Sequence, residues 1–253
     1  MTNSISIITP SYNCSKYIGI TIESVINQTF TNWELIIVDD CSTDHSAEII
    51  RHYAGLDLRI KPVFLSLNQG AAAARNEGLR QVTGRLIAFL DSDDVWLPDK
   101  LQIQFDFMLK TGAPISFTEY DVFDEELLTL QHHIQVPSTI DYSGYLKSTI
   151  IGMSTSMIDI EKTGAFTFFD IRTRQDTYLW ITLLKRGIVA RGIHQTLVKY
   201  RLRKDSISAN KLKAARQVWY LYYDLEKMNF FKAAYFFLNY GFNSLKKRLV
   251  SYA

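Results

Sequence analysis

A chain of 253 residues with 47% hydrophobic and 21% charged side chains suits a globular protein with a buried core. This composition excludes a disordered, collagen-like or disulfide-stabilised chain, and only two cysteines are present. The net charge of +2 hides an asymmetry, because residues 185–253 carry 15 Lys and Arg against 3 Asp and Glu, whereas residues 1–184 carry 13 against 23. Such a basic segment indicates either an anionic partner (a phosphate, a nucleic acid or a membrane surface) or a solvated helix face.

The sequence also bears on where the protein works. It contains no apolar run approaching the roughly 20 residues of a membrane-spanning helix. The polar first residues do not resemble a secretory signal, and the cysteines Cys14 and Cys41 suit a reducing compartment. We therefore expect a cytoplasmic protein. The basic, aromatic segment after residue 210 extends this expectation to the inner face of the cytoplasmic membrane.

The first 110 residues alternate between short β-branched runs and longer segments in which apolar residues recur at helical spacing. The predicted strands cover residues 5–9, 34–38, 61–65 and 85–90. The predicted helices cover residues 15–28, 43–54, 70–82 and 97–110. This alternation predicts a parallel, doubly wound sheet with helices on both faces.

The pattern is weaker after residue 111. We expect strands at 115–120 and 196–202, a loop or lid at 121–138, a strand pair or strand–turn at 150–160 and a helix at 176–186. From residue 210 onward the chain is predicted to be helical, with many aromatic side chains. The histidine pair His132 and His133 is interpreted as part of the loop, because adjacent side chains point apart on a regular element.

Acidic residues follow two of the predicted strands. Asp91-Ser92-Asp93-Asp94 comes directly after the fourth strand, where ligands bind in open α/β sheets. Crowded carboxylates repel one another unless a cation compensates, and Mg²⁺ or Mn²⁺ shared with substrate phosphates is suited to this role. The alternative is a solvated acidic loop in which Asp94 caps the next helix. After the second strand, Asp39 could accept a hydrogen bond from a nucleobase or ribose, whereas Asp44 suits a turn or cap.

Several motifs are missing from the chain. It has no G-x-G-x-x-G after the first strand, no G-x-x-x-x-G-K-[ST] and no Cys/His spacing typical of a zinc site. Nicotinamide-dependent redox chemistry and P-loop hydrolysis are therefore disfavoured. The basic C-terminal segment lacks a recognisable base-reading motif, so no nucleic-acid partner is expected.

Six short segments occur in a fixed order along the chain, at residues 7–13, 34–44, 68–76, 89–98, 174–180 and 200–208. Together they resemble the motifs of the family 2 glycosyltransferases, which are inverting enzymes with the GT-A fold. The resemblance covers about residues 4–210. It implies a GT-A type, doubly wound, mostly parallel sheet flanked by helices within residues 1–209. Residues 210–253 are then a helical, aromatic and basic C-terminal extension.

The resemblance implies roles for residues at the predicted strand ends. Thr9, Pro10 and Tyr12 correspond to positions that cradle uridine in the family. Asp39 corresponds to the acceptor for uracil or ribose, and Arg75 to a second contact with the nucleotide.

Four further positions match the metal and catalytic motifs of the family. Asp91, Ser92 and Asp93 match the D-x-D element that holds ribose and metal, with Asp93 as the ligand of Mn²⁺ or Mg²⁺. Asp176 matches the catalytic base, although Gln175 stands where many relatives carry Glu. A helix N-cap is the alternative role for Asp176.

The implied function is transfer of a sugar, with a hexose from a UDP-sugar as the favoured donor, onto a saccharide hydroxyl. The favoured acceptor is linked to polyprenyl diphosphate, as in bacterial surface glycan synthesis. Growing charge on the leaving diphosphate would be offset by the metal and by Arg201 or Arg203. A nucleotidyltransferase and a non-catalytic nucleotide-sugar-binding protein remain alternatives. The extension has three possible partners: a membrane, the domain itself, or a second copy of the chain in a homodimer.

Overall fold

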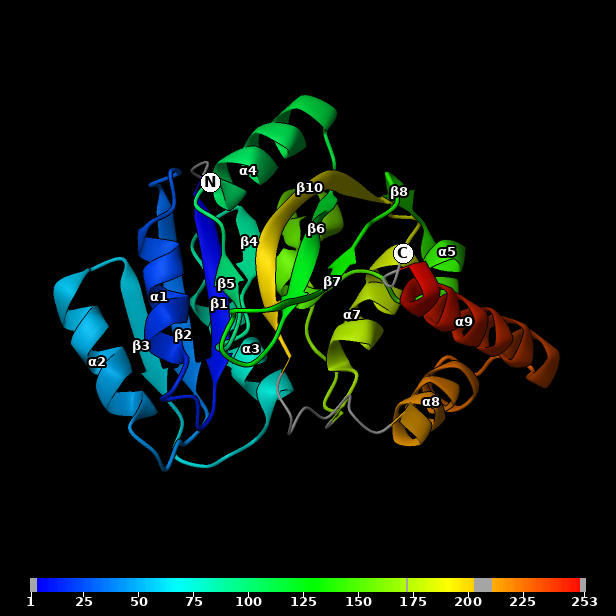
Figure 1. The fold of residues 1–253 in the computed structure, drawn as a ribbon, viewed down its shortest axis with the longest axis horizontal. Helices are drawn as coiled ribbons and strands as arrows, with labels where there is room; N and C mark the ends of the chain where they lie inside the picture. The colour runs from blue at the N-terminus through cyan, green and yellow to red at the C-terminus, as the bar shows by residue number, and fades with distance from the viewer. Residues whose placement is uncertain (1–3, 172, 203–210, 251–253) are drawn as a thin grey trace.

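The computed structural model describes residues 4–171, 173–202 and 211–250, without the side chains of 211–213 and 244–250. Within these residues ten strands form one sheet, and helices cover both of its faces (Figure 1). The strands are β1 (Ile5–Ser11), β2 (Trp33–Asp39), β3 (Ile60–Phe64), β4 (Leu86–Phe89), β5 (Val95–Trp96), β6 (Ile115–Phe123), β7 (Leu130–Ile134), β8 (Thr139–Ile140), β9 (Met157–Asp159) and β10 (Ala190–Arg201). The helices are α1 (Ile18–Ile26), α2 (Ser46–Leu56), α3 (Ala71–Gln81), α4 (Lys100–Thr111), α5 (Tyr142–Ser148), α6 (Ile160–Thr163), α7 (Gln175–Leu184), α8 (Lys211–Tyr220) and α9 (Phe230–Val250), with a 3₁₀ turn η1 (Met153–Thr155) and a π-helical turn η3 (Leu221–Leu225).

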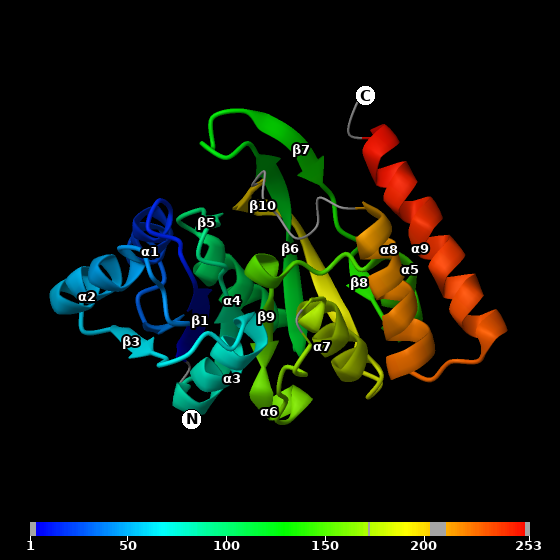
Figure 2. The ribbon, with the colours of Figure 1, turned by 90° about the horizontal axis from the view of Figure 1, so that it is seen from below.

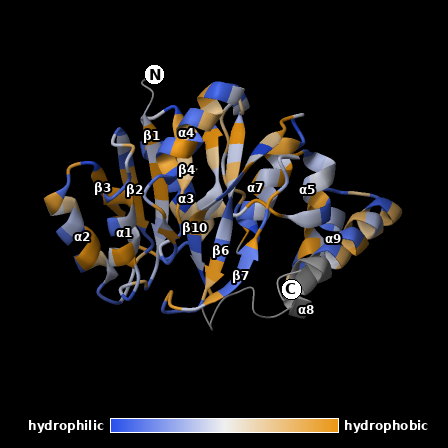
Figure 3. Cartoon of the chain, turned by 45° about the horizontal axis from the view of Figure 1, so that its top comes forward, coloured by the Kyte–Doolittle hydropathy of each residue, from blue (hydrophilic) through white to orange (hydrophobic). Residues whose placement is uncertain are grey.

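The N-terminal half is the parallel part of the sheet, with strands in the order β3-β2-β1-β4. Along β1, Ile5 and Ile7 pack with residues of α1, α2 and α4, whereas Ile8 lies in the core on the opposite face. Helix α3 lies on that opposite face (Figure 2). Because both faces are covered, these strands are rich in apolar residues, and Figure 3 shows them as largely hydrophobic. The predicted strand–helix alternation and α/β fold are confirmed.

Beyond β4 the sheet is mixed rather than mostly parallel. Strand β9 lies between β4 and β6 and is antiparallel to both, while β6 and β10 are parallel to each other. The reason is the position of η1 at the carboxyl end of β4, where the hydroxyl of Ser154 accepts a hydrogen bond from the backbone N–H of Asp91. Since β9 begins there without a crossover helix, it must run back along β4.

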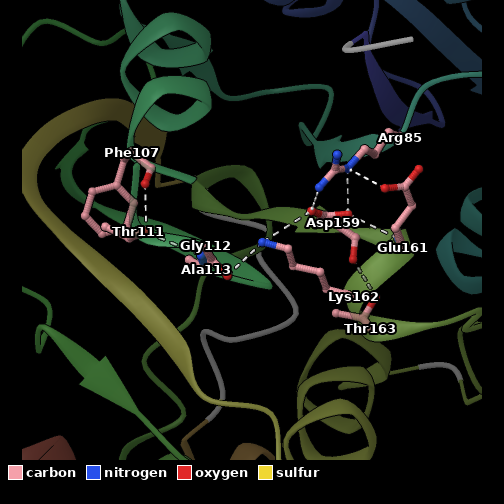
Figure 4. A network of polar contacts seen from close by, with 9 residues as sticks. All are labelled: Arg85, Phe107, Thr111, Gly112, Ala113, Asp159, Glu161, Lys162 and Thr163. Atoms are coloured by element: carbon pink, nitrogen blue, oxygen red, sulfur yellow. Dashed lines mark hydrogen bonds and ion pairs between the residues drawn. The ribbon is translucent and has the colours of Figure 1, made fainter. Parts of the chain in front are cut away.

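A polar network secures the opposite end of β9. Arg85 donates two hydrogen bonds to the carboxylate of Asp159, of 3.1 and 2.6 Å, and also pairs with Glu161 (Figure 4). Asp159 in turn caps α6 by accepting from the backbone N–H of Glu161. This network joins the start of β4 to the end of β9, since charged hydrogen bonds are the stronger ones.

Residues 121–138 are only partly a loop, which corrects the prediction. Strand β6 continues to Phe123, and β7 pairs with it in antiparallel fashion. His132 and His133 therefore lie on a strand, and Nδ1 of His133 is 2.7 Å from Oδ1 of Asp121. The sequence of β7 is polar because the strand is at the edge of the sheet, and Figure 3 shows it as hydrophilic.

The C-terminal extension is helical in its described residues, as predicted, and packs on the domain. Val218, Tyr222 and Phe236 belong to the same core cluster as Trp180 of α7. The hydroxyl of Tyr222 donates to the carbonyl of Leu146 in α5 at 2.5 Å. Figure 2 shows α8 and α9 side by side at the end of the molecule distant from β3.

One face of α9 carries large side chains that are exposed in the described structure. Phe231, Tyr235, Leu238 and Phe242 are 83%, 53%, 69% and 69% exposed, and their spacing of four, three and four residues places them along one side of the helix. Among the helices whose residues are described, none combines the length and the apolar character needed to cross a bilayer.

Candidate active-site cleft

A cleft of ≈ 620 Å³ lies at the carboxyl ends of β1 and β4, as expected for an open α/β sheet. One wall comes from the N-terminal half, and it consists of Pro10, Ser11, Tyr12, Asn13, Cys14, Asp40, Ala71, Ala74, Arg75, Asp91, Ser92 and Asp93. The other wall comes from the C-terminal half, and it consists of Met153, Thr173, Arg174, Gln175, Asp176, Tyr200, Arg201 and Gln217. The cleft is therefore built between segments far apart in the sequence.

Most of the residues singled out from the sequence meet in this cleft. The eight that line it are Pro10, Tyr12, Arg75, Asp91, Ser92, Asp93, Asp176 and Arg201. Thr9 and Asp39 do not line it. Thr9 is buried in β1, and its hydroxyl is one of the buried atoms without a hydrogen-bond partner in the described chain. The carboxylate of Asp39 instead accepts hydrogen bonds from the backbone N–H and hydroxyl of Ser42, at 2.9 and 2.6 Å.

The first carboxylate of the D-x-D element is paired with an arginine. Nη2 of Arg75 lies 2.5 Å from Oδ1 of Asp91, and the Arg75 side chain is only 5% exposed. Its Nε and Nη1 are buried without a hydrogen-bond partner among the described residues. Because unpaired buried donors cost about 1–3 kcal/mol each, their position at the cleft fits a ligand with acceptor oxygens.

Asp94 does not cap the following helix and is not solvated. It is buried, with Oδ1 accepting from the backbone N–H of Arg201 at 3.0 Å and Oδ2 accepting from the hydroxyl of Ser154 at 2.5 Å. Burial and the neighbouring charges of Asp93 and Asp91 raise the pKa of Asp94 well above its usual value. The N-cap of α4 is Asp99. The interpretation of residues 91–94 as a solvated acidic loop is therefore wrong.

The side chain of Arg201 spans the rim of the cleft. Its Nε donates to the carbonyl of Asp93 at 2.8 Å, its Nη1 donates to the carbonyl of Glu125, and its guanidinium lies 4.5 Å from the ring centre of Tyr17. Nη2 is buried without a hydrogen-bond partner in the described part of the chain. Arg203 and the rest of the expected closing loop, through residue 208, lie outside the described residues.

Asp176 occupies the second position of α7 and faces the cleft. The N-cap of this helix is Arg174, whose φ of +62° is unusual for a non-glycine residue, so the capping alternative for Asp176 is wrong. The hydroxyl of Thr177 is 3.4 Å from Oδ1 of Asp176, a long contact. The positive end of the helix dipole stabilises a carboxylate at this position.

Two cleft residues, Asn13 and Asp40, belong to the sequence motifs but have no role predicted from the sequence. Asn13 has a φ of +48°, and its side-chain oxygen accepts from the backbone N–H of Thr43 at 2.8 Å. The carboxylate of Asp40 accepts from the backbone N–H groups of Gln69 and Gly70, at 2.8 and 2.7 Å, and so fixes the start of α3. The adjacent acids Asp39 and Asp40 indicate a site at this strand end, but the sequence does not tell which of the two faces the cleft.

Among the described residues, no group of three or more His, Cys, Asp and Glu side chains is arranged to hold a metal ion. Four acids line the cleft, namely Asp40, Asp91, Asp93 and Asp176. Asp40 already accepts from two backbone N–H groups, and Asp91 is paired with Arg75. This limited donor set fits Mg²⁺ or Mn²⁺ bound by one or two carboxylates together with substrate phosphates.

Comparison with known proteins is consistent with this geometry. The family described as glycosyl transferase family 2 matches residues 6–173. The chain is 46% identical over 245 residues to the putative teichuronic acid biosynthesis glycosyltransferase TuaG of Bacillus subtilis strain 168, covering 97% of each. It is 36% identical over 249 residues to the UDP-Glc:alpha-D-GlcNAc-diphosphoundecaprenol beta-1,3-glucosyltransferase WfgD of Escherichia coli, covering 98% of this chain and 96% of that protein.

A solved structure with a similar fold is the mannosyltransferase PcManGT from Pyrobaculum calidifontis in complex with GDP-Man and Mn²⁺. The TM-score is 0.69 at 17% sequence identity, and the match covers 89% of this chain and 64% of that chain. At this identity the likeness is evidence for the fold alone.

Proposed function

Since the chain belongs to glycosyl transferase family 2 and has the GT-A fold, we propose that this glycosyltransferase moves a hexose from a UDP-sugar to a saccharide hydroxyl with inversion. The acceptor is a saccharide linked to polyprenyl diphosphate, and the product belongs to a bacterial surface glycan. WfgD, which by its name uses UDP-Glc and a diphosphoundecaprenol acceptor, supports these substrates. The observation that carries the proposal is that Asp93 and Asp176 line the same cleft.

In this proposal the N-terminal wall binds the nucleotide. Tyr12 is 46% exposed at the cleft and beside Pro10, which suits stacking against uracil. Thr9 and Asp39 lie behind this wall, and Asp39 shapes it through its hydrogen bonds to Ser42. Nη2 of Arg75 pairs with Asp91. Its buried Nε and Nη1 groups are then the proposed donors to oxygens of the ribose or diphosphate.

The diphosphate is proposed to lie between Arg201 and the D-x-D element. Asp93, with Asp91 and Ser92 beside it in the sequence, would hold Mn²⁺ or Mg²⁺, which would supply Lewis-acid stabilisation of the leaving diphosphate. The buried Nη2 of Arg201, which lacks a partner in the described chain, adds a donor for the same charge.

On the other wall Asp176 is the proposed general base. It removes the proton from the acceptor hydroxyl as that oxygen attacks the anomeric carbon, a contribution worth roughly 10² to 10⁴ in rate. A single displacement converts an α-linked donor sugar into a β-linked product. We place this machinery within residues 1–209.

The C-terminal extension, residues 210–253, is proposed to contact the cytoplasmic face of the membrane. The exposed apolar face of α9 is next to the exposed lysine Lys232, and Lys246, Lys247 and Arg248 follow it in the sequence. Apolar and basic side chains on one helix suit an interface with anionic lipid, where a lipid-linked acceptor is presented. The protein is then a cytoplasmic one at the inner membrane face, and a second copy of the chain is the competing occupant of this surface.

A product assay tests the proposed reaction. Purified protein is incubated with Mn²⁺, a panel of UDP-sugars and a synthetic GlcNAc-diphospholipid, and UDP, pyrophosphate and glycolipid are measured. We expect UDP release that depends on acceptor, and a β-linkage by NMR. Pyrophosphate release would instead identify a nucleotidyltransferase. Nucleotide-sugar binding without release of either product would identify a binding protein.

A further inference from the structure

The C-terminal extension reaches the cleft. Gln217, on α8, lines the same cavity as Gln175 and Asp176 at the start of α7. It lies beyond the region of residues 6–173 that matches the family and beyond the motifs in the sequence. The lining of the cleft is therefore completed by a segment that does not belong to the recognisable catalytic motifs.

Helix α8 is held firmly where it meets the cleft. Val218, the residue after Gln217, is fully buried in the main core. Just beyond η3, Glu226 accepts hydrogen bonds from Lys185, at the end of α7, and from Tyr142 of α5, at 2.7 and 3.0 Å. These contacts tie α8 to the helix that carries Asp176, so the position of Gln217 relative to the proposed base is set by packing.

Gln175, which precedes Asp176, has a buried polar atom that lacks a partner in the described part of the chain. The side-chain oxygen of Gln175 is buried without a hydrogen-bond partner among the described residues, although the residue lines the cleft. Such an oxygen needs a donor, and a hydroxyl or acetamido N–H of a sugar supplies one. Gln217 adds a second neutral amide, which both donates and accepts. The amides of Gln175 and Gln217 suit sugar hydroxyls, whereas the guanidinium groups of Arg75 and Arg201, which contact Asp91 and Asp93, suit an anion.

We propose that Gln217 and Gln175 form the subsite for the acceptor sugar, so that the C-terminal extension determines acceptor specificity. This inference rests on the proposed glycosyl transfer. The amides bind hydroxyl or acetamido groups of the sugar whose free hydroxyl is deprotonated by Asp176. Donor binding does not involve Gln217, since the nucleotide lies against the other wall.

Steady-state kinetics with a short-chain, detergent-soluble GlcNAc-diphospholipid test the subsite separately from any membrane effect. We expect Gln217→Leu to raise the acceptor KM at least tenfold while UDP-sugar affinity stays within twofold. Gln217→Glu, which keeps an acceptor oxygen, should lose less than Gln217→Leu. Arg216→Gln is the matched control, because Arg216 is the exposed neighbour on the same helix and does not line the cleft.

The results distinguish the acceptor subsite from the proposed glycosyl transfer. Transfer by the wild-type protein, combined with the same acceptor KM for Gln217→Leu and Arg216→Gln, would overturn the subsite and leave the proposed function standing. A Gln217→Leu variant that loses donor affinity as much as acceptor affinity would also overturn it. If the wild-type protein binds UDP-sugars but transfers nothing, the proposed function fails, and the subsite with it.

Discussion

The carboxylate of Asp94 accepts a 3.0 Å hydrogen bond from the backbone N–H of Arg201, which joins the acidic loop after β4 to the end of β10. Its second oxygen accepts from the hydroxyl of Ser154 in η1. One buried side chain therefore positions three segments that meet at the cleft. Nε of Arg201 also donates a hydrogen bond to the carbonyl of Asp93 in the same loop.

Replacing Asp94 by alanine should loosen this junction. Asp94→Ala leaves the Arg201 N–H and the Ser154 hydroxyl buried without an acceptor, at about 1–3 kcal/mol each. We expect the Tm to fall by about 4–8 °C or more and UDP affinity to weaken, as measured by calorimetry. Asp94→Asn should behave nearly as wild type, because its carbonyl still accepts from the N–H of Arg201, and because burial and the charges of Asp93 and Asp91 raise the pKa of Asp94 and so favour a neutral group. An Asp94→Ala variant as stable as the exposed-site control Asp106→Ala would contradict this role.

The role of Asp176 is tested by a neutral isostere. Asp176→Asn removes the proton acceptor without changing the shape of the cleft, so we expect kcat to fall at least a hundredfold while UDP affinity is nearly unchanged. Asp170→Asn serves as the control, since Asp170 is exposed and does not line this cleft. Activity of Asp176→Asn within a few-fold of wild type would remove it from the mechanism.

We expect the effect of Mn²⁺ on UDP binding to require Asp93. Titration of UDP by isothermal calorimetry, with Mn²⁺ and with EDTA, should show that Mn²⁺ strengthens binding to the wild-type protein and not to Asp93→Ala. Asp106→Ala should keep the metal effect, because that residue is exposed on α4, away from the cleft. Equal titrations of wild type with and without Mn²⁺ would count against a metal site.

Acid stability should depend on Glu34, a buried carboxylate in β2. Burial opposes its ionisation, but hydrogen bonds from Lys61, Ser6 and Thr83 outweigh burial and lower the pKa of Glu34 from 4.5 to about 2. The ionised form is thus favoured in the folded protein. Its contribution to the free energy of unfolding, up to about 3 kcal/mol, is present above pH 4.5 and is lost as the pH falls from 4.5 toward 2.

Urea unfolding of Glu34→Gln tests the direction of this pH dependence of stability. The variant should be less stable than wild type at pH 7, and the difference should shrink as the pH falls below 4.5. The exposed residue Glu48 gives the control Glu48→Gln, which should follow the wild-type curve. A difference between Glu34→Gln and wild type that is constant from pH 7 to pH 3 would disprove the assignment.

Vesicle sedimentation tests the exposed face of α9. The triple variant Phe231→Ser, Leu238→Ser and Phe242→Ser should lose binding to anionic phospholipid vesicles, because those side chains supply the apolar contact. Leu56→Ser with Leu58→Ser removes equally exposed apolar side chains on α2 and just beyond it, and it should leave binding intact. Equal sedimentation of both variants would refute the membrane proposal, and a dimer lost only in the triple variant would assign the face to a second copy.

The regular part of the fold was predictable because its signals are local. Strands β1 to β4 are apolar runs bounded by turn residues, and the intervening helices show apolar residues at helical spacing. Strand β7 was missed because residues 130–134 are polar, and only pairing with β6 makes them a strand. Strand β10 begins at Ala190 rather than residue 196, since its first residues gain regular structure by pairing with β6 and β8.

The amino-acid sequence by itself determined which residues are candidates for the chemistry, since motifs at strand ends place acids and arginines at the edge where the carboxyl ends of parallel strands meet. Tertiary structure alone decided which of them meet. In the folded protein Asp94 is buried, and the carboxylate of Asp39 accepts hydrogen bonds from Ser42. Gln217 of α8 lines the same cleft as the first residues of α7. The physical reason is that pattern and propensity act over a few residues, whereas the cleft depends on burying helix faces against a sheet assembled from distant segments.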